Sequence, residues 1–190
     1  HYSDFLMPTI RGSTTGSKKR YAGIIKKISE VDGKLIFNEE LVFKGLETVR
    51  TDWTNLAKEF QRTLYLMIFK GEPYKDYICS TVAKLLSSDY DERLVYKKKL
   101  RRKLSEYQKS TPPHVKAARK LYSLSGQLLG LGDTIHYIIT VNGPEPISHH
   151  ASAIDYQHYI DKQLQPIANS ILNFVDDSFE RITNQQLALL

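Results

Sequence analysis

Residues 21–37 read Tyr-Ala-Gly-Ile-Ile-Lys-Lys-Ile-Ser-Glu-Val-Asp-Gly-Lys-Leu-Ile-Phe, with Asp-Gly at positions 32 and 33 between two apolar runs. Asp-Gly suits the two-residue turns that join antiparallel strands, because both turn positions need a positive φ. This stretch therefore predicts a β-hairpin. The apolar residues near the start of the chain predict a further strand, so we expect β structure over residues 1–43.

A helical pattern replaces this alternation in the rest of the chain. One apolar stripe runs from Trp53 to Ile68 at helical spacing, and Gly71 and Pro73 follow it as stop signals. The further helices that we expect are residues 74–86, a segment that starts at Pro113, and most of 156–179.

The segment 96–107 has two interpretations. Its apolar residues, Tyr96, Leu100, Leu104 and Tyr107, are spaced by four, four and three residues, which predicts a helix with one apolar stripe. Such a helix would leave four cations on or beside its open face: Lys97, Lys98, Arg101 and Arg102. A short strand over 94–96 that leads into the helix is the alternative.

A second strand signal lies at residues 134–141, whose side chains are largely β-branched or aromatic. The run Asn-Gly-Pro-Glu-Pro at 142–146 closes this strand, and a loop rich in Gly, Ser and Leu is expected at 123–133.

The fold class that follows is α+β. An N-terminal β-hairpin region over 1–43 is followed by a mostly α-helical domain over 44–182 with a small strand pair. Residues 183–190 are expected to form a C-terminal tail peptide.

Length and composition exclude several classes of protein. The 190 residues suit one domain or one lobe of a larger protein, and 41% of them are hydrophobic, which is enough for a core. Cys79 is the single cysteine, so a disulfide framework and a multi-cysteine zinc site are excluded. No uncharged apolar run approaches the roughly 18 residues of a membrane span. We therefore expect a cytoplasmic protein without a membrane partner, and the start on His1 suggests a fragment of a longer chain.

The charge is modest in total but strongly segregated. The formal net charge is +6, yet residues 93–120 hold eleven basic residues against one acid, whereas 121–190 hold two against seven. Such separation is typical of a surface that binds a polyanion, and the aromatic residues beside the basic runs favour nucleic acid. A solvated, charged helix face is the structural alternative.

No group of residues predicts catalysis. His149 and His150 are adjacent, so their side chains diverge and serve one metal ion poorly. Asp155 and His158 are three residues apart and fit a pair on a helix surface. We therefore expect no catalytic residue, no metal site and no cofactor within these 190 residues.

Two short motifs flank the predicted hairpin. Lys18-Lys19-Arg20-Tyr21 places three cations before an aromatic ring, a set that can hold phosphates and lie against a sugar or base. Residues 44–53 read Lys-Gly-Leu-Glu-Thr-Val-Arg-Thr-Asp-Trp. The charged residues of this second motif are expected to form an ion network at a strand-to-helix corner: Lys44, Glu47, Arg50 and Asp52.

Together these motifs resemble the end of the palm and the start of the thumb in family B DNA polymerases, especially bacterial members. The resemblance covers essentially the whole chain and continues through further motifs: Leu94-Val95-Tyr96, Pro113-His114-Val115, Gly132-Asp133-Thr134, Asp155-Tyr156 and Gln163-Leu164-Gln165-Pro166. It implies that residues 1–43 are the edge of the palm and that residues 44–182 are the thumb.

The resemblance also implies a DNA-binding surface. In the family, the Lys-Lys-Arg-Tyr motif contacts the primer near its growing end, and the thumb wraps the newly formed duplex. The residues that these roles assign to DNA are Lys18, Lys19, Arg20, Tyr21, Lys44, Arg50, Lys97, Lys98, Arg101, Arg102 and His114. Little sequence preference is expected, because phosphate contacts position a protein without reading bases.

The parent that this resemblance implies is a DNA-directed DNA polymerase, a nucleotidyltransferase that uses Mg²⁺. The family's catalytic carboxylates lie in palm motifs that do not occur in these 190 residues. The fragment is therefore expected to bind DNA without polymerising it. Its expected partners are primer–template duplex DNA and the remaining polymerase domains in cis.

The last five residues, Gln186-Leu187-Ala188-Leu189-Leu190, resemble the Gln-Leu-x-Leu-Phe peptide that docks bacterial polymerases on the sliding clamp. The residues that this implies for clamp binding are Gln186, Leu187, Leu189 and Leu190, with Leu190 where Phe is usual. An ordinary frayed helix end is the alternative.

Two other functions stay open at this point. A free-standing nucleic-acid-binding or protein-interaction module would bind single-stranded RNA as well as duplex DNA. An enzyme in its own right would need a catalytic group that the sequence does not display.

Overall fold

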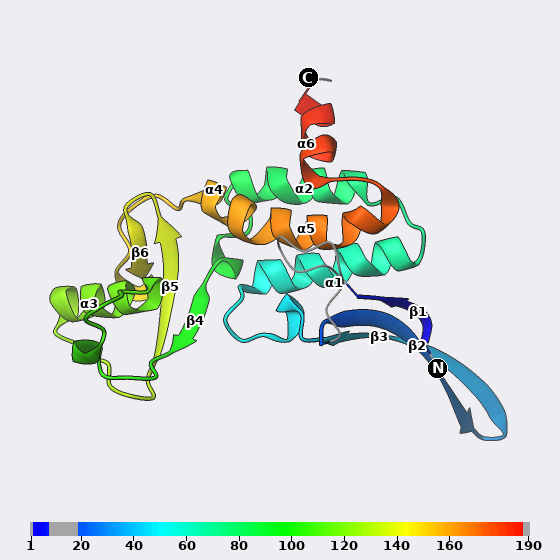
Figure 1. The fold of residues 1–190 in the computed structure, drawn as a ribbon, viewed down its shortest axis with the longest axis horizontal. Helices are drawn as coiled ribbons and strands as arrows, with labels where there is room; N and C mark the ends of the chain where they lie inside the picture. The colour runs from blue at the N-terminus through cyan, green and yellow to red at the C-terminus, as the bar shows by residue number, and fades with distance from the viewer. Residues whose placement is uncertain (1, 8–18, 188–190) are drawn as a thin grey trace. The chain divides into compact units, whose positions relative to one another are not determined.

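The computed structural model describes residues 2–7 and 19–187, which fall into two compact units. Unit 1 comprises His1–Arg50, Ala57–Ala83 and Lys162–Leu190, and unit 2 comprises Thr51–Leu56 and Lys84–Asp161. Each unit combines a small antiparallel sheet with helices (Figure 1), so the α+β fold class is confirmed. The palm, thumb and tail boundaries stay a prediction.

The sheet of unit 1 has the strand order β1-β2-β3. Its strands are β1 (Tyr2–Leu6), β2 (Tyr21–Val31) and β3 (Lys34–Lys44). Asp32 and Gly33 form the two-residue turn with φ angles of 51° and 73°, and Val31 pairs with Lys34 across it. The predicted hairpin is therefore confirmed, with positive φ at both turn residues as a type I′ turn requires.

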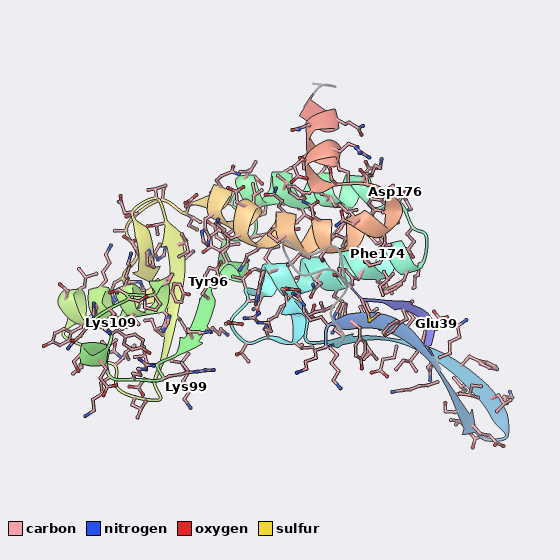
Figure 2. The ribbon with its side chains drawn as sticks, viewed as in Figure 1. Glu39, Tyr96, Lys99, Lys109, Phe174 and Asp176 are labelled. Atoms are coloured by element: carbon pink, nitrogen blue, oxygen red, sulfur yellow. The ribbon has the colours of Figure 1, made fainter. Side chains whose placement is uncertain are left out.

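The two halves of this hairpin differ in burial. Ala22 pairs with Phe43 near the base of the hairpin, and both are buried. Every residue of β2 from Lys26 onward is exposed, and Figure 1 shows this part of the ribbon continuing beyond β1. Lys26 pairs there with Glu39, which is labelled in Figure 2, at 3.7 Å.

Four α-helices of the described residues lie wholly or mainly in unit 1. They are α1 (Asn55–Phe69), α2 (Lys75–Leu86), α5 (Gln165–Leu172) and α6 (Phe179–Leu187), and a few end residues of α1 and α2 belong to unit 2. The helices predicted over 53–68 and 74–86 are confirmed.

Tyr65 of α1 lies at the centre of the core of unit 1. Its ring is fully buried and lies 5.6 Å from the ring of Phe43 on β3, which ties the helix to the sheet. Its hydroxyl forms a 2.8 Å hydrogen bond with the Ser170 hydroxyl of α5. Phe60 of α1 stacks on Tyr77 of α2 with ring centroids 5.8 Å apart. Aromatic packing thus joins the sheet, α1 and α2, and a hydrogen bond adds α5.

Unit 2 contains a second sheet, with the strand order β4-β5-β6. Its strands are β4 (Tyr96–Lys99), β5 (Thr134–Thr140) and β6 (Gly143–Pro146). Helix α3 (Pro113–Ser125) packs on β5 and β6 (Figure 1). The short helix α4 (Tyr156–Tyr159) leads into a π-helix at Ile160–Leu164. The 3₁₀ turns of the described residues are Glu47–Val49, Asp91–Arg93, Leu104–Glu106, Ile147–His149 and Asn173–Val175.

The helix predicted over 96–107 is wrong. Residues 96–99 form strand β4, which pairs with residues 134–137 of β5, and only Leu104–Glu106 adopt a helical turn. The ladder continues past β4, because Leu100 donates its N–H to the Asp133 carbonyl at 2.8 Å. Tyr96, Lys98 and Leu100 lie on the inward side as in a strand, so the four-residue spacing of Tyr96 and Leu100 also fits an extended chain with period two.

The segments predicted as strand and loop around α3 differ only in their limits. Strand β5 matches the one predicted at 134–141, and part of the segment predicted to close it forms strand β6. The predicted loop at 123–133 begins later, because α3 continues to Ser125 and ends at Gly126 in the left-handed conformation. Within the described part of the chain, no helix is long and apolar enough to cross a membrane.

Candidate nucleic-acid interface

The Lys-Lys-Arg-Tyr motif enters β2 at a tight corner of unit 1. Lys18 lies outside the described residues, Lys19 is exposed, and Tyr21 begins the strand opposite Lys44 of β3. Directly paired residues of two antiparallel strands project to the same side, so Tyr21 and Lys44 share one face of the hairpin. The structure therefore brings together three predicted residues from two motifs: Lys19, Tyr21 and Lys44.

Gly45 makes this corner possible. It has a φ of +65°, and a Cβ placed there would lie 2.3 Å from the Lys19 carbonyl oxygen and 3.4 Å from Cγ of Arg20. Any side chain at this position would push the two motifs apart. The close packing of residues 19–20 against residue 45 thus depends on glycine.

A buried polar network lies behind the corner. Arg20 Nη2 donates to Glu47 Oε1 at 2.6 Å, and Gln61 Nε2 of α1 donates to Glu47 Oε2 at 2.7 Å. Gln61 Oε1 in turn accepts hydrogen bonds from the Thr48 N–H at 2.8 Å and the Thr48 hydroxyl at 2.6 Å. Both carboxylate oxygens of Glu47 are therefore occupied, which compensates for the burial of its charge.

The ion network expected at residues 44–53 has different partners from those predicted. Glu47 binds Arg20 of the other motif. Asp52, in unit 2, forms an ion pair with Lys98 of β4 at 2.8 Å. The carboxylates thus bind cations from outside their own segment. Lys44 and Arg50 are exposed at the two ends of this corner.

In unit 2, the cations of β4 differ in exposure because alternate residues of a strand face opposite sides. Lys97 and Lys99 are exposed, and so is Arg101 just beyond the strand, whereas Leu100 is buried and Lys98 is half-buried against Asp52. Lys97 and Lys98 therefore project to opposite faces and do not share the open helix face that was predicted. The exposed cations alternate with inward residues, and Figure 2 labels Lys99, the last residue of β4.

Two other cations of the basic segment bind internal acceptors. Arg119 Nη2 donates to the carbonyls of Leu104 and Tyr107, each at 3.0 Å, and so holds that loop on α3. Lys120 pairs with the buried carboxylate of Glu145. The surface charge available to a polyanion is thus smaller than the eleven basic residues of the segment suggest.

His114 lies at the start of α3 and is half-buried. Its ring meets the ring of Tyr107 edge-on at 6.0 Å. Burial, and then the nearby charge of Lys98, lower the pKa of His114 below its usual value of 6.5. Its imidazole is therefore mainly neutral at pH 7, and a DNA contact by His114 would be a hydrogen bond without a full charge.

Sequence reasoning missed one part of this surface. The exposed His136 lies directly opposite Lys97 on β5. Lys99 and Lys103 are exposed as well and belong to the same basic run as the predicted cations. His136 could not be placed without the strand register.

The remaining candidates have structural roles. The Asp155 side chain caps α4 by accepting the His158 backbone N–H at 3.1 Å. Cys79 is buried, and burial raises the pKa of its thiol, which disfavours the reactive thiolate. Among the described residues, no group of three His, Cys, Asp or Glu side chains could hold a metal ion.

The predicted clamp-binding peptide lies at the edge of the described chain. The backbone of Gln186 and Leu187 belongs to the last turn of α6. Leu189 and Leu190 lie outside the described residues. Clamp binding by this peptide stays a prediction.

The structure thus places a row of exposed cations on and after β4, and a corner with Lys19 and Lys44, on an α+β framework, and comparison with known proteins names the family. The sequence model of DNA polymerase family B matches residues 15–184. The chain therefore belongs to DNA polymerase family B.

Individual relatives agree with this assignment. The chain is 51% identical over 195 aligned positions to DNA polymerase II of Escherichia coli (strain K12), covering 100% of this chain and 24% of that protein. It is 33% identical to DNA polymerase 2 of Aeropyrum pernix, over 88% of this chain and 21% of that protein. The chain thus spans about a quarter or less of the length of these relatives.

A solved structure matches as well. The family B DNA polymerase from the hyperthermophilic archaeon Pyrobaculum calidifontis superposes with a TM-score of 0.61 and 30% sequence identity. The match covers 83% of this chain and 20% of that polymerase.

Proposed function

We propose that this chain is the part of a DNA-directed DNA polymerase that grips the primer–template duplex, with the palm edge at 1–43 and the thumb at 44–182. The observation that carries the proposal is the row of exposed cations on and after β4, within the segment that matches DNA polymerase family B. These cations are Lys97, Lys99, Arg101, Arg102 and Lys103.

The mechanism of the grip is electrostatic. Lysine and arginine side chains neutralise backbone phosphates and release the counterions condensed on DNA. Outward residues of one strand recur every second position, so Lys97 and Lys99 present their charge on the same side to a phosphate backbone, and the exposed Arg101 follows just beyond the strand. This arrangement has no hydrogen-bond pattern matched to base edges, which suits a polymerase that must bind any sequence.

At the other site, Lys18, Lys19, Tyr21 and Lys44 would hold the primer strand near its growing end. Lys19 and Lys44 supply exposed charge, and the Tyr21 ring can lie against a sugar or base. The catalytic carboxylates and the Mg²⁺ that they bind would come from the rest of the polymerase, so this chain alone would bind DNA without extending it.

Duplex binding is tested by fluorescence anisotropy of labelled primer–template DNA, single-stranded DNA and duplex RNA across a salt series. The expected result is preference for duplex DNA, with log Kd rising against log salt by about 0.9 for each phosphate contact. Lys97→Ala should weaken binding, whereas Lys84→Ala, an exposed lysine on α2, serves as the matched control. Equal binding to all three nucleic acids would favour a general nucleic-acid-binding module instead.

A second function is supported by the tail sequence. We infer that Gln186, Leu187, Leu189 and Leu190 dock the polymerase on the sliding clamp, with the leucines entering an apolar pocket. In that role the protein would work in the bacterial cytoplasm at the nucleoid. The test of this docking is the last one argued in the Discussion.

A further inference from the structure

We propose that Arg20 is a positioning residue for DNA binding and does not itself contact phosphate. The inference rests on the proposed function, because it concerns how the chain holds the DNA-binding residues Lys19 and Tyr21. In the Lys-Lys-Arg-Tyr motif, Arg20 would therefore have a different role from the lysines before it.

The first argument is the burial of the Arg20 guanidinium. Nη2 is bound to Glu47 at 2.6 Å, and Nε is a buried nitrogen that makes no hydrogen bond within the described part of the chain. The side chain is only 23% exposed. Arginine holds phosphate best with two parallel N–H groups. Because Nε is buried and Nη2 is held by Glu47, the fork formed by these two nitrogens is not available to a phosphate.

The second argument is the rigidity of the anchor. Glu47 is buried, and its other oxygen is held by Gln61, which is fully buried on α1. Gln61 is fixed in turn by two hydrogen bonds from Thr48. Arg20 therefore ends on a carboxylate that cannot turn toward solvent without breaking several hydrogen bonds at once.

The third argument is the position of Arg20 in the chain. Its direct neighbours in the chain are Lys19, which is exposed, and Tyr21, which is half-buried with its ring 5.3 Å from the ring of Phe5. The Lys19 carbonyl packs at Gly45, two residues before Glu47. The fixed Arg20 side chain and this close packing therefore hold residues 19–21 against the corner formed by residues 45–47. Lys19 and Tyr21 are thus oriented before DNA binds.

Three substitutions separate a positioning role from direct contact. Lys19→Gln removes a proposed phosphate contact and should lower the magnitude of the salt slope by about 0.9. Arg20→Gln and Glu47→Gln should each weaken duplex binding by roughly 3- to 30-fold at every salt concentration, the range of coupling within one network, and leave the slope unchanged. The double variant should be no weaker than the weaker single variant, because both residues act through one link.

The direction in which Glu47→Gln changes duplex affinity distinguishes the two roles of Arg20. This substitution keeps the size of the side chain and removes only the negative charge. If Arg20 binds phosphate, removing its internal competitor should leave duplex affinity unchanged or raise it. If Arg20 positions its neighbours, affinity should fall. A fall in the Arg20→Gln slope equal to that of Lys19→Gln, or a Glu47→Gln variant with undiminished affinity, would overturn the proposal.

The failures of the two ideas can be told apart. If the unchanged chain binds no duplex, the proposed function is refuted, whereas duplex binding with the wrong slope pattern refutes only the role of Arg20. Circular dichroism of each variant checks folding. If Arg20→Gln does not fold, Glu47→Gln decides alone. If neither folds, the residues are structural for unit 1, and the positioning role is rejected.

Discussion

The Lys120 ammonium and the Glu145 carboxylate form an ion pair that joins α3 to β6. The Glu145 side chain is 1% exposed, and it also accepts the backbone N–H of Ala151 at 2.9 Å. Ser152 contributes two more hydrogen bonds, from its N–H at 3.2 Å and its hydroxyl at 2.9 Å. One carboxylate thus fixes a helix, a strand and the loop at 151–152 around itself, which is how a buried charge becomes tolerable.

Glu145 should make the stability of unit 2 depend on pH. Burial alone would raise the pKa of Glu145, but hydrogen bonds from Lys120, Ala151 and Ser152 outweigh it and lower the pKa from 4.5 to about 2. Because the folded pKa lies below the unfolded one, the contribution is complete above about pH 4.5 and is lost as pH falls toward 2. Glu145→Gln should lower the free energy of unfolding at pH 7 by about 3 kcal/mol and flatten its decline in acid.

The measurement is urea unfolding at neutral pH and at several values below 4.5. Glu92→Gln is the matched control, because Glu92 is an exposed acid of the same unit. Equal acid sensitivity of the Glu145→Gln variant and the unchanged chain would contradict the assignment.

Lys97 and Lys98 are adjacent cations, and we expect Lys97 to contribute to duplex binding and Lys98 to stability. Lys97→Ala should reduce the salt slope of duplex binding by about 0.9 and change the free energy of unfolding by less than about 0.5 kcal/mol. Lys98→Ala removes the partner of Asp52 and should cost about 1 kcal/mol of stability, with little change in the salt slope. Anisotropy and urea unfolding of both variants check this. Matching slope losses in the two would show that β4 does not orient them as described.

Gly45→Ala tests the close approach of the two motifs. A left-handed residue other than glycine costs about 1–2 kcal/mol, and the new Cβ would also meet the Lys19 carbonyl oxygen at 2.3 Å. Gly33→Ala is the matched control, because it has a φ of +73° and no atom within 4 Å of the added Cβ. Gly45→Ala should therefore be the more destabilising of the two in urea unfolding. Equal losses in the free energy of unfolding would mean that the backbone at residues 19 and 45 shifts to accept the new Cβ at no measurable cost.

The hairpin and the first two helices were predictable because their signals are local. An Asp-Gly pair between apolar runs specifies a turn through its own backbone preferences, and the stripe before Gly71 ends where the helix ends. The segment 96–107 was not predictable in this way. Its structure depends on pairing with residues 134–137. A spacing of four residues places side chains on one face of a helix and also on one face of a strand.

The candidate site shows the same division. The sequence identified both motifs at the corner, yet the partner of Glu47 is Arg20, 27 residues away, and the partner of Asp52 is Lys98, 46 residues away. Opposite charges interleaved within one segment suggested local pairing. Ion pairs between distant segments depend on tertiary packing, so the residues could be selected from the sequence but their partners could not.

The tail provides the last prediction. Removing residues 186–190 should abolish binding to a purified sliding clamp, because a short peptide of this kind derives its affinity from a few apolar side chains. Duplex affinity should not change, since the tail holds no basic residue. Leu190→Phe should raise clamp affinity by roughly tenfold, as a larger ring buries more apolar area in the same pocket. Surface plasmon resonance on immobilised clamp measures the clamp affinity of the deletion and of Leu190→Phe, with Ala188→Ser as the control. Clamp binding that survives the deletion would place the docking site elsewhere in the chain.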